Sequence, residues 1–474
     1  MTDPQPLDRL PRIEDFQADY TREQILSAEA LNTRAIAMQA YLQAFPAFLH
    51  MRQLTEFIQG RRYFAPAECP LGGWVLMREL ATPKTTTVSP NVDTLYGASY
   101  LLLDQQGPVV LSVPPIPGRY YSVAILDAYF NNFAIVSPRT YGNAGGEYLV
   151  VPPGWRGEPP AGIRAVLDAP TPSICLLQRI FTRNPGEYET LHALQDAIQL
   201  TPLDRWRQGE RGFPTVDLSA YEIQGMRMVR DPLQFFEYTN FYTGINLPPP
   251  GDASLAELFR TVGVGPGSRL PGDPESQQAI RQGAADAQDI MNARISAGAI
   301  RNGWRVPDPT SGLAGPHLLA RAVVQATQMG LFPLQEAIYF FAYRDGENQT
   351  LHGSQRYTIT FKKGELPPLR EFGFWSLTMY NEISLLVENA LNRYIIRPDS
   401  PGLTTAPDGS LSVYIQCDRP GDAPEGNWLP APAGAFNMAL RTYLPQPGIV
   451  DGTWFPPAIE RVRSAEHYHG YTND

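Results

Sequence analysis

Two stretches of this chain consist of short apolar and aromatic runs separated by turn residues, and this pattern restricts the fold most strongly. The first stretch extends from about residue 74 to 175 and the second from about 339 to 443. Runs of about four to eight such residues, bounded by Gly, Pro, Asn and Asp, are typical of β-strands, and their close spacing favours a β-sandwich or jelly roll. The expected strands are 100–103, 109–113, 120–126, 133–136, 148–151, 357–361, 374–380, 395–396, 411–416 and 438–443.

Helical periodicity precedes and separates these stretches. Residues 21–60 are predicted to form a helix that Thr21 caps together with Gln24 and that Pro46 breaks or kinks. Four further helices are expected at 187–200, 255–262, 275–300 and 318–330.

We therefore predict a mainly β protein with helical segments (α+β), in which two β-sandwich or jelly-roll-like modules stand in tandem and are joined by helices. The predicted domains are an N-terminal extension and helix at 1–60, a first β-sandwich module at 61–185, a mixed helical linking region at 186–345 and a C-terminal jelly-roll-like module at 346–474. Segments 118–127 and 374–381 both have aromatic residues near their start, and they end on Asp and Asn, respectively. This similarity suggests two related modules, which should then share one strand order.

Composition and charge exclude several classes of partner. Hydrophobic residues make up 43% of the 474 residues, enough for a large core. The net charge is −10 and only 18% of residues are charged, so neither nucleic acid nor a membrane surface is expected to bind. No run of about 18 apolar residues is present, which predicts no membrane span. The start of the chain lacks a basic-then-apolar signal, and Cys69, Cys175 and Cys417 lie far apart, which together predict a reduced, cytoplasmic protein.

No metal and no cofactor are predicted. The six histidines show no zinc or iron spacing with a carboxylate. The sequence contains no G-x-S-x-G elbow, no P-loop and no G-x-G-x-x-G after a strand.

The first candidate site lies in the string from Ser89 to Tyr96. Asp93 beside Tyr96 can act as a general base with an orienting phenol, and Asn91 shares a strand face with Asp93 as a substrate-binding candidate. Alternatively, Asn91 and Asp93 bond to backbone N–H groups of the turn after Pro90.

A second candidate pair lies on the expected central strand 120–126. Both faces of this strand are mostly apolar, so Asp127 at its end should be partly desolvated, which raises a carboxyl pKa. Asp127 and Tyr121 are therefore further catalytic candidates. The alternative for Asp127 is a structural ion pair with an arginine such as Arg119, Arg139 or Arg179.

The C-terminal module supplies the remaining candidates for substrate binding. Thr378 and Tyr380 lie on a polar strand face, and arginine side chains suit carboxylate binding. Alternatively, the arginines bind an internal carboxylate and not a ligand. For Trp428, the alternative to lining a pocket is burial in the core under its loop. The candidates are Trp375, Thr378, Tyr380, Arg393, Trp428 and Arg441.

These strings resemble a tandem of two domain-of-unknown-function families, 1254 followed by 1214. The first resemblance rests on Ser89-Pro90-Asn91-x-Asp93-Thr94-Leu95-Tyr96, Gly118-Arg119-Tyr120-Tyr121 and Asp127-Ala128-Tyr129. The second rests on Glu336-Ala337-x-Tyr339, Phe374-Trp375-Ser376-Leu377-Thr378-x-Tyr380, Asn427-Trp428-Leu429-Pro430 and Arg441-x-Tyr443. The resemblance implies a β-sandwich module at each end, helices between them and a homo-oligomer. It implies no established reaction.

The predicted function is a cofactor-independent lyase, isomerase or hydrolase that acts on a small, partly apolar organic molecule. Asp93 or Asp127 would serve as acid–base group, Tyr96 or Tyr121 as hydrogen-bond donor, and Arg393 or Arg441 as anion anchor. One alternative is a non-catalytic module that binds a carbohydrate, lipid or protein. A further alternative is that the polar strings form structural networks alone.

Overall fold

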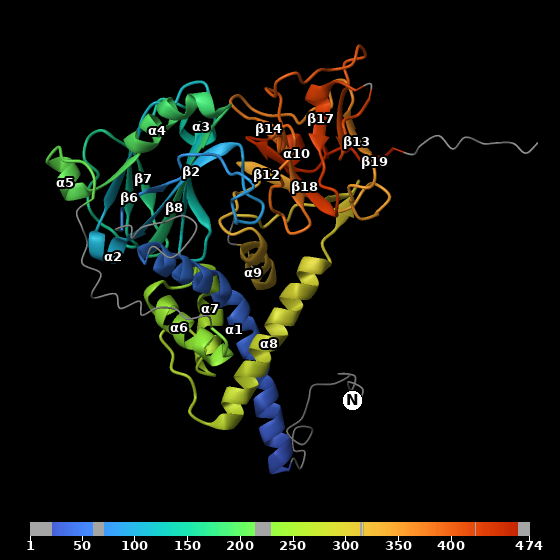
Figure 1. The fold of residues 1–474 in the computed structure, drawn as a ribbon. Helices are drawn as coiled ribbons and strands as arrows, with labels where there is room; N and C mark the ends of the chain where they lie inside the picture. Colours follow the sequence, from blue (N-terminus) through green and yellow to red (C-terminus); the bar gives the residue numbers. More distant parts are fainter. Residues whose placement is uncertain are drawn as a thin grey trace, which may run out of the picture.

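The computed structural model describes residues 21–59, 71–213, 229–312, 315, 317–421 and 423–462. Its fold is α+β, with four sheets and a group of helices. Two β-sandwiches lie side by side, while helices α1 (Arg22–Ile58) and α8 (Pro274–Ser296) extend away from them (Figure 1). Cys69 and the last two histidines, at 467 and 469, lie outside the described residues.

The first sandwich pairs a five-stranded sheet, ordered β1-β2-β8-β4-β5, with a four-stranded sheet, ordered β7-β6-β3-β9. Leu95, Leu111 and Ile125 belong to the core between them. The strands are β1 Val75–Leu76, β2 Thr94–Leu102, β3 Val109–Val113, β4 Tyr121–Leu126, β5 Asn132–Val136, β6 Gly146–Val151, β7 Ile163–Asp168, β8 Ser173–Phe181 and β9 Gln199–Pro202.

The second sandwich pairs a six-stranded sheet, ordered β10-β11-β12-β18-β14-β15, with a four-stranded sheet, ordered β17-β16-β13-β19. Trp375, Ile359 and Leu440 belong to its core. The strands are β10 Ile300–Arg301, β11 Trp304–Arg305, β12 Ala337–Ala342, β13 Tyr357–Phe361, β14 Trp375–Asn381, β15 Ile395–Ile396, β16 Leu411–Gln416, β17 Trp428–Pro430, β18 Phe436–Tyr443 and β19 Ile459–Arg461.

Apart from the extra edge strand β10, both sandwiches have the same strand order, strand for strand. In each, the four-stranded sheet carries its one parallel pair at the same place, β6 with β7 and β16 with β17. Backbone hydrogen bonds repeat as well: Thr182 N donates to Asp93 O at 2.9 Å, and Leu444 N donates to Glu336 O at 2.9 Å. The expected relation between the two modules is therefore confirmed by strand order.

Five helices pack together in one core with part of the first five-stranded sheet (Figure 1). They are α1 Arg22–Ile58, α6 Pro232–Ile245, α7 Ala253–Arg260, α8 Pro274–Ser296 and α9 Leu318–Thr327. The other helices are α2 Leu103–Gln106, α3 Pro138–Tyr141, α4 Tyr188–Ala197, α5 Leu203–Arg207 and α10 Pro447–Val450, with short 3₁₀ helices at Pro185–Glu187, Pro250–Asp252 and Glu425–Asn427.

Helix α1 begins with the predicted cap: Gln24 N donates to Thr21 Oγ1 at 3.2 Å, and Thr21 N donates to Gln24 Oε1 at 2.9 Å. Pro46 lies inside α1 and does not break it, because the helix continues to Ile58. The buried His50 bonds to Tyr242 Oη through Nδ1 at 2.7 Å, and burial lowers the pKa of His50 to about 3. The second half of α1 thus forms part of the core.

Candidate functional site

The polar faces of the two large sheets meet where the modules pack against each other. In the first sheet one row crosses three strands, and an equivalent row crosses the second sheet. The first row is Tyr96, Arg179 and Ser122, and the second row is Tyr339, Arg441 and Ser376. Because the modules share one topology, each row occupies the same position in its own module. We call these two rows, together with Asn91, Asp93, Glu336, Thr378, Tyr380 and Tyr443, the intermodule cluster.

Aromatic rings form the centre of this interface. The ring centroids of Phe181 and Phe374 are 4.2 Å apart, and those of the equivalent pair, Tyr443 and Tyr120, are 5.0 Å apart. Tyr120 and Phe374, which also occupy equivalent positions, face each other at 5.8 Å. The two modules therefore meet through corresponding surfaces with approximate twofold symmetry.

Asp93 is fully buried at the end of the loop that precedes β2. Ser376 of the other module donates to Asp93 Oδ2 at 2.7 Å. No described residue donates a hydrogen bond to Oδ1, which lies 3.7 Å from Arg397 Nη1. Burial raises the pKa of Asp93, while Arg397 and Arg441 oppose this rise. One carboxyl oxygen is thus fixed and the other is available to accept a proton.

Asn91 positions two phenols beside Asp93. Asp93 N donates to Asn91 Oδ1 at 2.6 Å, which orients the amide. The amide then donates to Tyr96 Oη at 3.2 Å and to Tyr443 Oη at 2.7 Å. Because Asn91 is the donor in both bonds, each phenol retains its own proton to donate.

The tyrosine hydroxyls of the cluster contact one another across the modules. Tyr339 Oη lies 3.4 Å from Tyr443 Oη. Burial raises the pKa of Tyr339 to about 12. The pKa of Tyr443 is raised well above its usual value, mainly by burial and to a smaller extent by the neighbouring Tyr339. Both phenols therefore remain protonated donors at neutral pH.

Arg441 is buried, and both of its Nη atoms donate to neutral acceptors. Its Nη1 donates to Thr378 Oγ1 at 3.0 Å, and its Nη2 donates to Tyr380 Oη at 2.8 Å and to Ser89 O at 3.1 Å. Tyr380 Oη in turn donates to Pro90 O at 2.7 Å. These bonds tie β14 and β18 to the loop that carries Asp93.

Glu336 is the counterpart of Asp93 in the second module and is also fully buried. Three groups of the first module hold it: Arg139 Nε at 2.7 Å, Tyr120 Oη at 3.1 Å and Ser137 Oγ at 3.1 Å. Burial raises the pKa of Glu336, and Arg139 opposes the rise. Each module thus supplies a buried carboxyl that is held by the other module.

Six of the eleven predicted residues meet in the intermodule cluster: Asn91, Asp93, Tyr96, Thr378, Tyr380 and Arg441. Tyr339, Tyr443, Ser376, Glu336 and Arg179 belong to it but were not among the predicted site residues. The sequence does carry a signal for some of them, because Arg-x-aromatic occurs at Arg179–Phe181 and again at Arg441–Tyr443. Aligning the two modules would have paired these segments.

Asp127 lies apart from the cluster and organises a turn. Its Oδ1 accepts from Tyr129 N at 2.8 Å and from Asn131 N at 3.0 Å. The equivalent residue is Asn381, whose Oδ1 accepts from Ile383 N at 3.1 Å and Leu385 N at 2.9 Å. Because an uncharged amide makes the same turn, the carboxylate of Asp127 serves to cap the turn.

The other four predicted residues also lie elsewhere. Tyr121 points into the first core and donates to Gly142 O at 2.8 Å, and Trp375 lies in the second core. Arg393 Nη1 holds a loop through the carbonyls of Glu425 and of Trp428, the latter at 2.9 Å. Trp428 is buried, and its Nε1 donates to Gln416 O at 2.9 Å. Their strand parity or loop position directs them away from the module interface.

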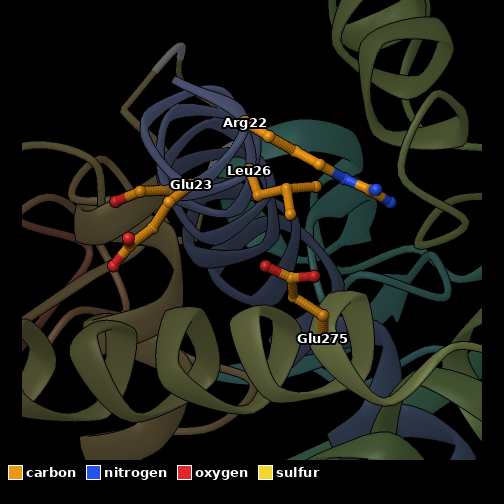
Figure 2. A pocket seen from close by; sticks show the side chains of 5 residues that line it. Arg22, Glu23, Leu26 and Glu275 are labelled. Carbon is orange, nitrogen blue, oxygen red and sulfur yellow. The ribbon is translucent and has the colours of Figure 1, made fainter. Parts of the chain in front are cut away.

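A hollow of about 600 Å³ opens at the start of α1, beside the first turn of α8 (Figure 2). Arg22, Glu23, Leu26, Ser27 and Glu275 line it, and all five are exposed. No buried polar group is present among them to hold a ligand in place. This hollow is therefore not a candidate site.

The described ranges contain neither a metal-binding group of side chains nor a membrane-spanning helix. No three His, Cys, Asp or Glu side chains there are grouped so that they could hold a metal ion. None of the described helices combines the length and apolar character needed to cross a bilayer.

Comparisons with known proteins agree with the two-module arrangement. The model of DUF1254, a family of proteins of unknown function, matches residues 74–202, and that of DUF1214, also of unknown function, matches 336–447. The structure of the VPA0106 protein from Vibrio parahaemolyticus has a TM-score of 0.69 and 22% identity over 91% of this chain and 100% of its own, which shows a common fold. A putative uncharacterized protein from Burkholderia cenocepacia has a TM-score of 0.42 and 12% identity over 92% of this chain and 96% of its own. No curated protein matches the chain.

Proposed function

Because the chain belongs to the proteins that join a DUF1254 domain to a DUF1214 domain, we propose that the interface between these two domains is an active site for a small, partly apolar organic molecule. The reaction would be a cofactor-independent lyase, isomerase or hydrolase step. The observation that carries this proposal is the buried Asp93 carboxyl, with one oxygen held by Ser376 and the other without a hydrogen bond.

In this proposal Asp93 moves the proton. A buried carboxyl with a raised pKa is a stronger base than an exposed one, which suits proton transfer near neutral pH. Ser376 orients the carboxyl, while Tyr96 and Tyr443 donate hydrogen bonds to an oxygen that gains charge. The rings of Tyr120, Phe181 and Phe374 supply the apolar wall.

The test compares turnover by two variants that each exchange a buried aspartate for asparagine. The full chain is incubated with a panel of small hydroxy acids, esters, amides and unsaturated acids, and conversion is followed by NMR. We expect Asp93→Asn to lower kcat at least about a hundredfold and Tyr96→Phe to lower it about tenfold. Asp127→Asn should keep the wild-type rate, because Asn381 performs the same turn-capping role as an amide.

Full turnover by Asp93→Asn would contradict the proposed role of this carboxyl. If the wild-type chain binds members of the panel without converting any of them, a non-catalytic binding function is favoured. The homo-oligomer implied by the resemblance and the cytoplasmic location expected from the sequence stay predictions.

A further inference from the structure

The repeat allows two equivalent buried arginines to be compared directly. Arg179 pairs with Tyr96 and Ser122 across its sheet, as Arg441 pairs with Tyr339 and Ser376. Only 6% of Arg179 and 3% of Arg441 is exposed. The two guanidinium groups therefore start from the same position in the fold and from similar desolvation.

Their hydrogen bonding differs sharply. Arg441 donates to Thr378, Tyr380 and the carbonyl of Ser89. Arg179 has a side-chain hydrogen bond to Tyr96, but its Nε and Nη1 have no hydrogen-bond partner, and no described carboxylate forms an ion pair with it. Its guanidinium carbon instead lies 4.2 Å from the ring centre of Phe332 and 4.9 Å from that of Tyr96.

A buried cation with free donors is costly, and arginine cannot avoid the cost by losing its proton. Contacts with aromatic faces offset part of this cost and leave the donors available. The Thr94 hydroxyl, two residues before Tyr96 on the same strand face, is also buried without a partner. Two polar groups on one face of the intermodule cluster are thus free to hold a ligand.

The charges around the interface indicate what this ligand is. Several arginines at the interface lie close to carboxyls, which Arg179 does not. Arg139 pairs with Glu336, Arg397 pairs with Asp93 and Asp399, and Arg441 is close enough to lower the pKa of Asp93. No described carboxylate forms an ion pair with Arg179, so a bound carboxylate would supply the counter-charge that this buried cation lacks.

We infer that Arg179 is the anion anchor of the intermodule site and that the substrate is a small organic carboxylate. This inference rests on the proposed function for the location of the site, and it names the class of substrate. The predicted anchors, Arg441 and Arg393, are already bonded to internal acceptors. A carboxylate on Arg179 would lie in the same cluster as Asp93 and the phenols of Tyr96 and Tyr443.

The test measures the melting temperature and binding affinity of the full chain with sodium acetate and sodium benzoate. Acetamide and benzamide are the uncharged controls, and inorganic phosphate at equal ionic strength is the anion control. We expect at least one carboxylate to raise Tm saturably, and its amide and phosphate to leave Tm unchanged. Arg179→Met should weaken carboxylate binding about ten- to hundredfold and raise the Tm of the free protein, because it removes an unpaired buried charge.

Two further variants keep the test decisive. Arg301→Met removes an exposed arginine that also lies over a ring, 4.7 Å from that of Phe455, and should keep the carboxylate response. Arg179→Lys keeps the charge and should bind more weakly than wild type but more tightly than Arg179→Met. Equal responses to carboxylate and amide, an equal response to phosphate, or an unchanged response in Arg179→Met would overturn the inference. Binding is measured without turnover. A negative binding result would therefore contradict the role of Arg179, whereas full turnover by Asp93→Asn would contradict the catalytic role of Asp93.

Discussion

At the scale of single residues, side chains at equivalent places in the two modules can be compared directly. Asp127 and Asn381 accept the same kind of backbone hydrogen bonds, although only Asp127 can carry a charge. The role of Asp127 is therefore to cap the turn. Arg179 and Arg441 share a position but not their hydrogen bonding. The repeat therefore acts as an internal control that separates structural from functional polar groups.

The raised pKa of Asp93 predicts a pH-dependent stability difference. The folded-state pKa lies above the unfolded value of about 3.9, so this carboxyl favours the folded state at low pH, and the contribution is lost as pH rises through the folded-state pKa. Asp93→Asn has no such loss. The Tm of the variant relative to wild type should therefore increase as pH rises from the unfolded value of about 3.9 through the folded-state pKa, as thermal melting at a series of pH values would measure.

A control with the opposite sign is available at the surface. Asp408 accepts hydrogen bonds from Ser410 N at 2.9 Å and from Ser410 Oγ at 2.7 Å, which lower its pKa. The Tm of Asp408→Asn relative to wild type should consequently fall as pH rises. A flat profile for Asp93→Asn would show that its carboxyl is not desolvated in the folded state.

At the scale of elements, close contact between α1 and α8 depends on a glycine. A Cβ at Gly283 of α8 would lie 2.4 Å from Arg34 O and 2.9 Å from Met38 N, both backbone atoms of α1. Gly283→Ala should destabilise the protein by about 1–3 kcal/mol, because overpacking outweighs the gain of about 1 kcal/mol in helix propensity. Denaturant unfolding measures this effect.

The neighbouring Gln282 is exposed and provides the matched control. Gln282→Ala should change stability by less than about 0.5 kcal/mol. A stabilised Gly283→Ala variant would mean that the two helices can separate without cost.

The elements themselves are predictable from local patterns only in part. Strands β7, β8, β9, β12 and β17, among others, were not predicted, although β8 and β12 lie inside the two large sheets. Strands 109–113, 357–361, 395–396 and 411–416 occur with the predicted bounds, since apolar runs between turn residues depend on neighbours in sequence. Helix α6 was not predicted; its residues are apolar around most of its surface, so it lacks the helical pattern of apolar positions. The site is harder to predict, because strand parity does not say which face meets the other module. Tyr121 and Tyr96 were equal candidates in sequence, yet one points into a core and the other into the interface.

At the scale of the whole molecule, buried carboxyls that reach across the interface hold the modules together. Glu336 is fully buried against Arg139, whose side chain is 25% exposed. Arg139→Met should destabilise the protein by about 2–4 kcal/mol, because it leaves a buried carboxylate without its counter-ion. Adding Glu336→Gln should recover part of this loss, which a double-mutant cycle measured by denaturant unfolding would detect.

The surface pair Arg205–Glu210, at 2.6 Å, serves as the comparison. Its side chains are 36% and 46% exposed, so Arg205→Met should cost less than about 1 kcal/mol. If Arg139→Met costs no more than this surface variant, the ion pair across the modules does not stabilise their packing.

We propose that two related modules form one site at their interface, with Arg179 receiving an anion in the same cluster as Asp93. A crystal structure of the full chain soaked in sodium benzoate would locate this anion. The expected result is a benzoate carboxylate within hydrogen-bond distance of Arg179 Nε or Nη1, between the two large sheets. Benzoate ordered only elsewhere, for example at Arg393 or in the hollow beside α1, would contradict the claim.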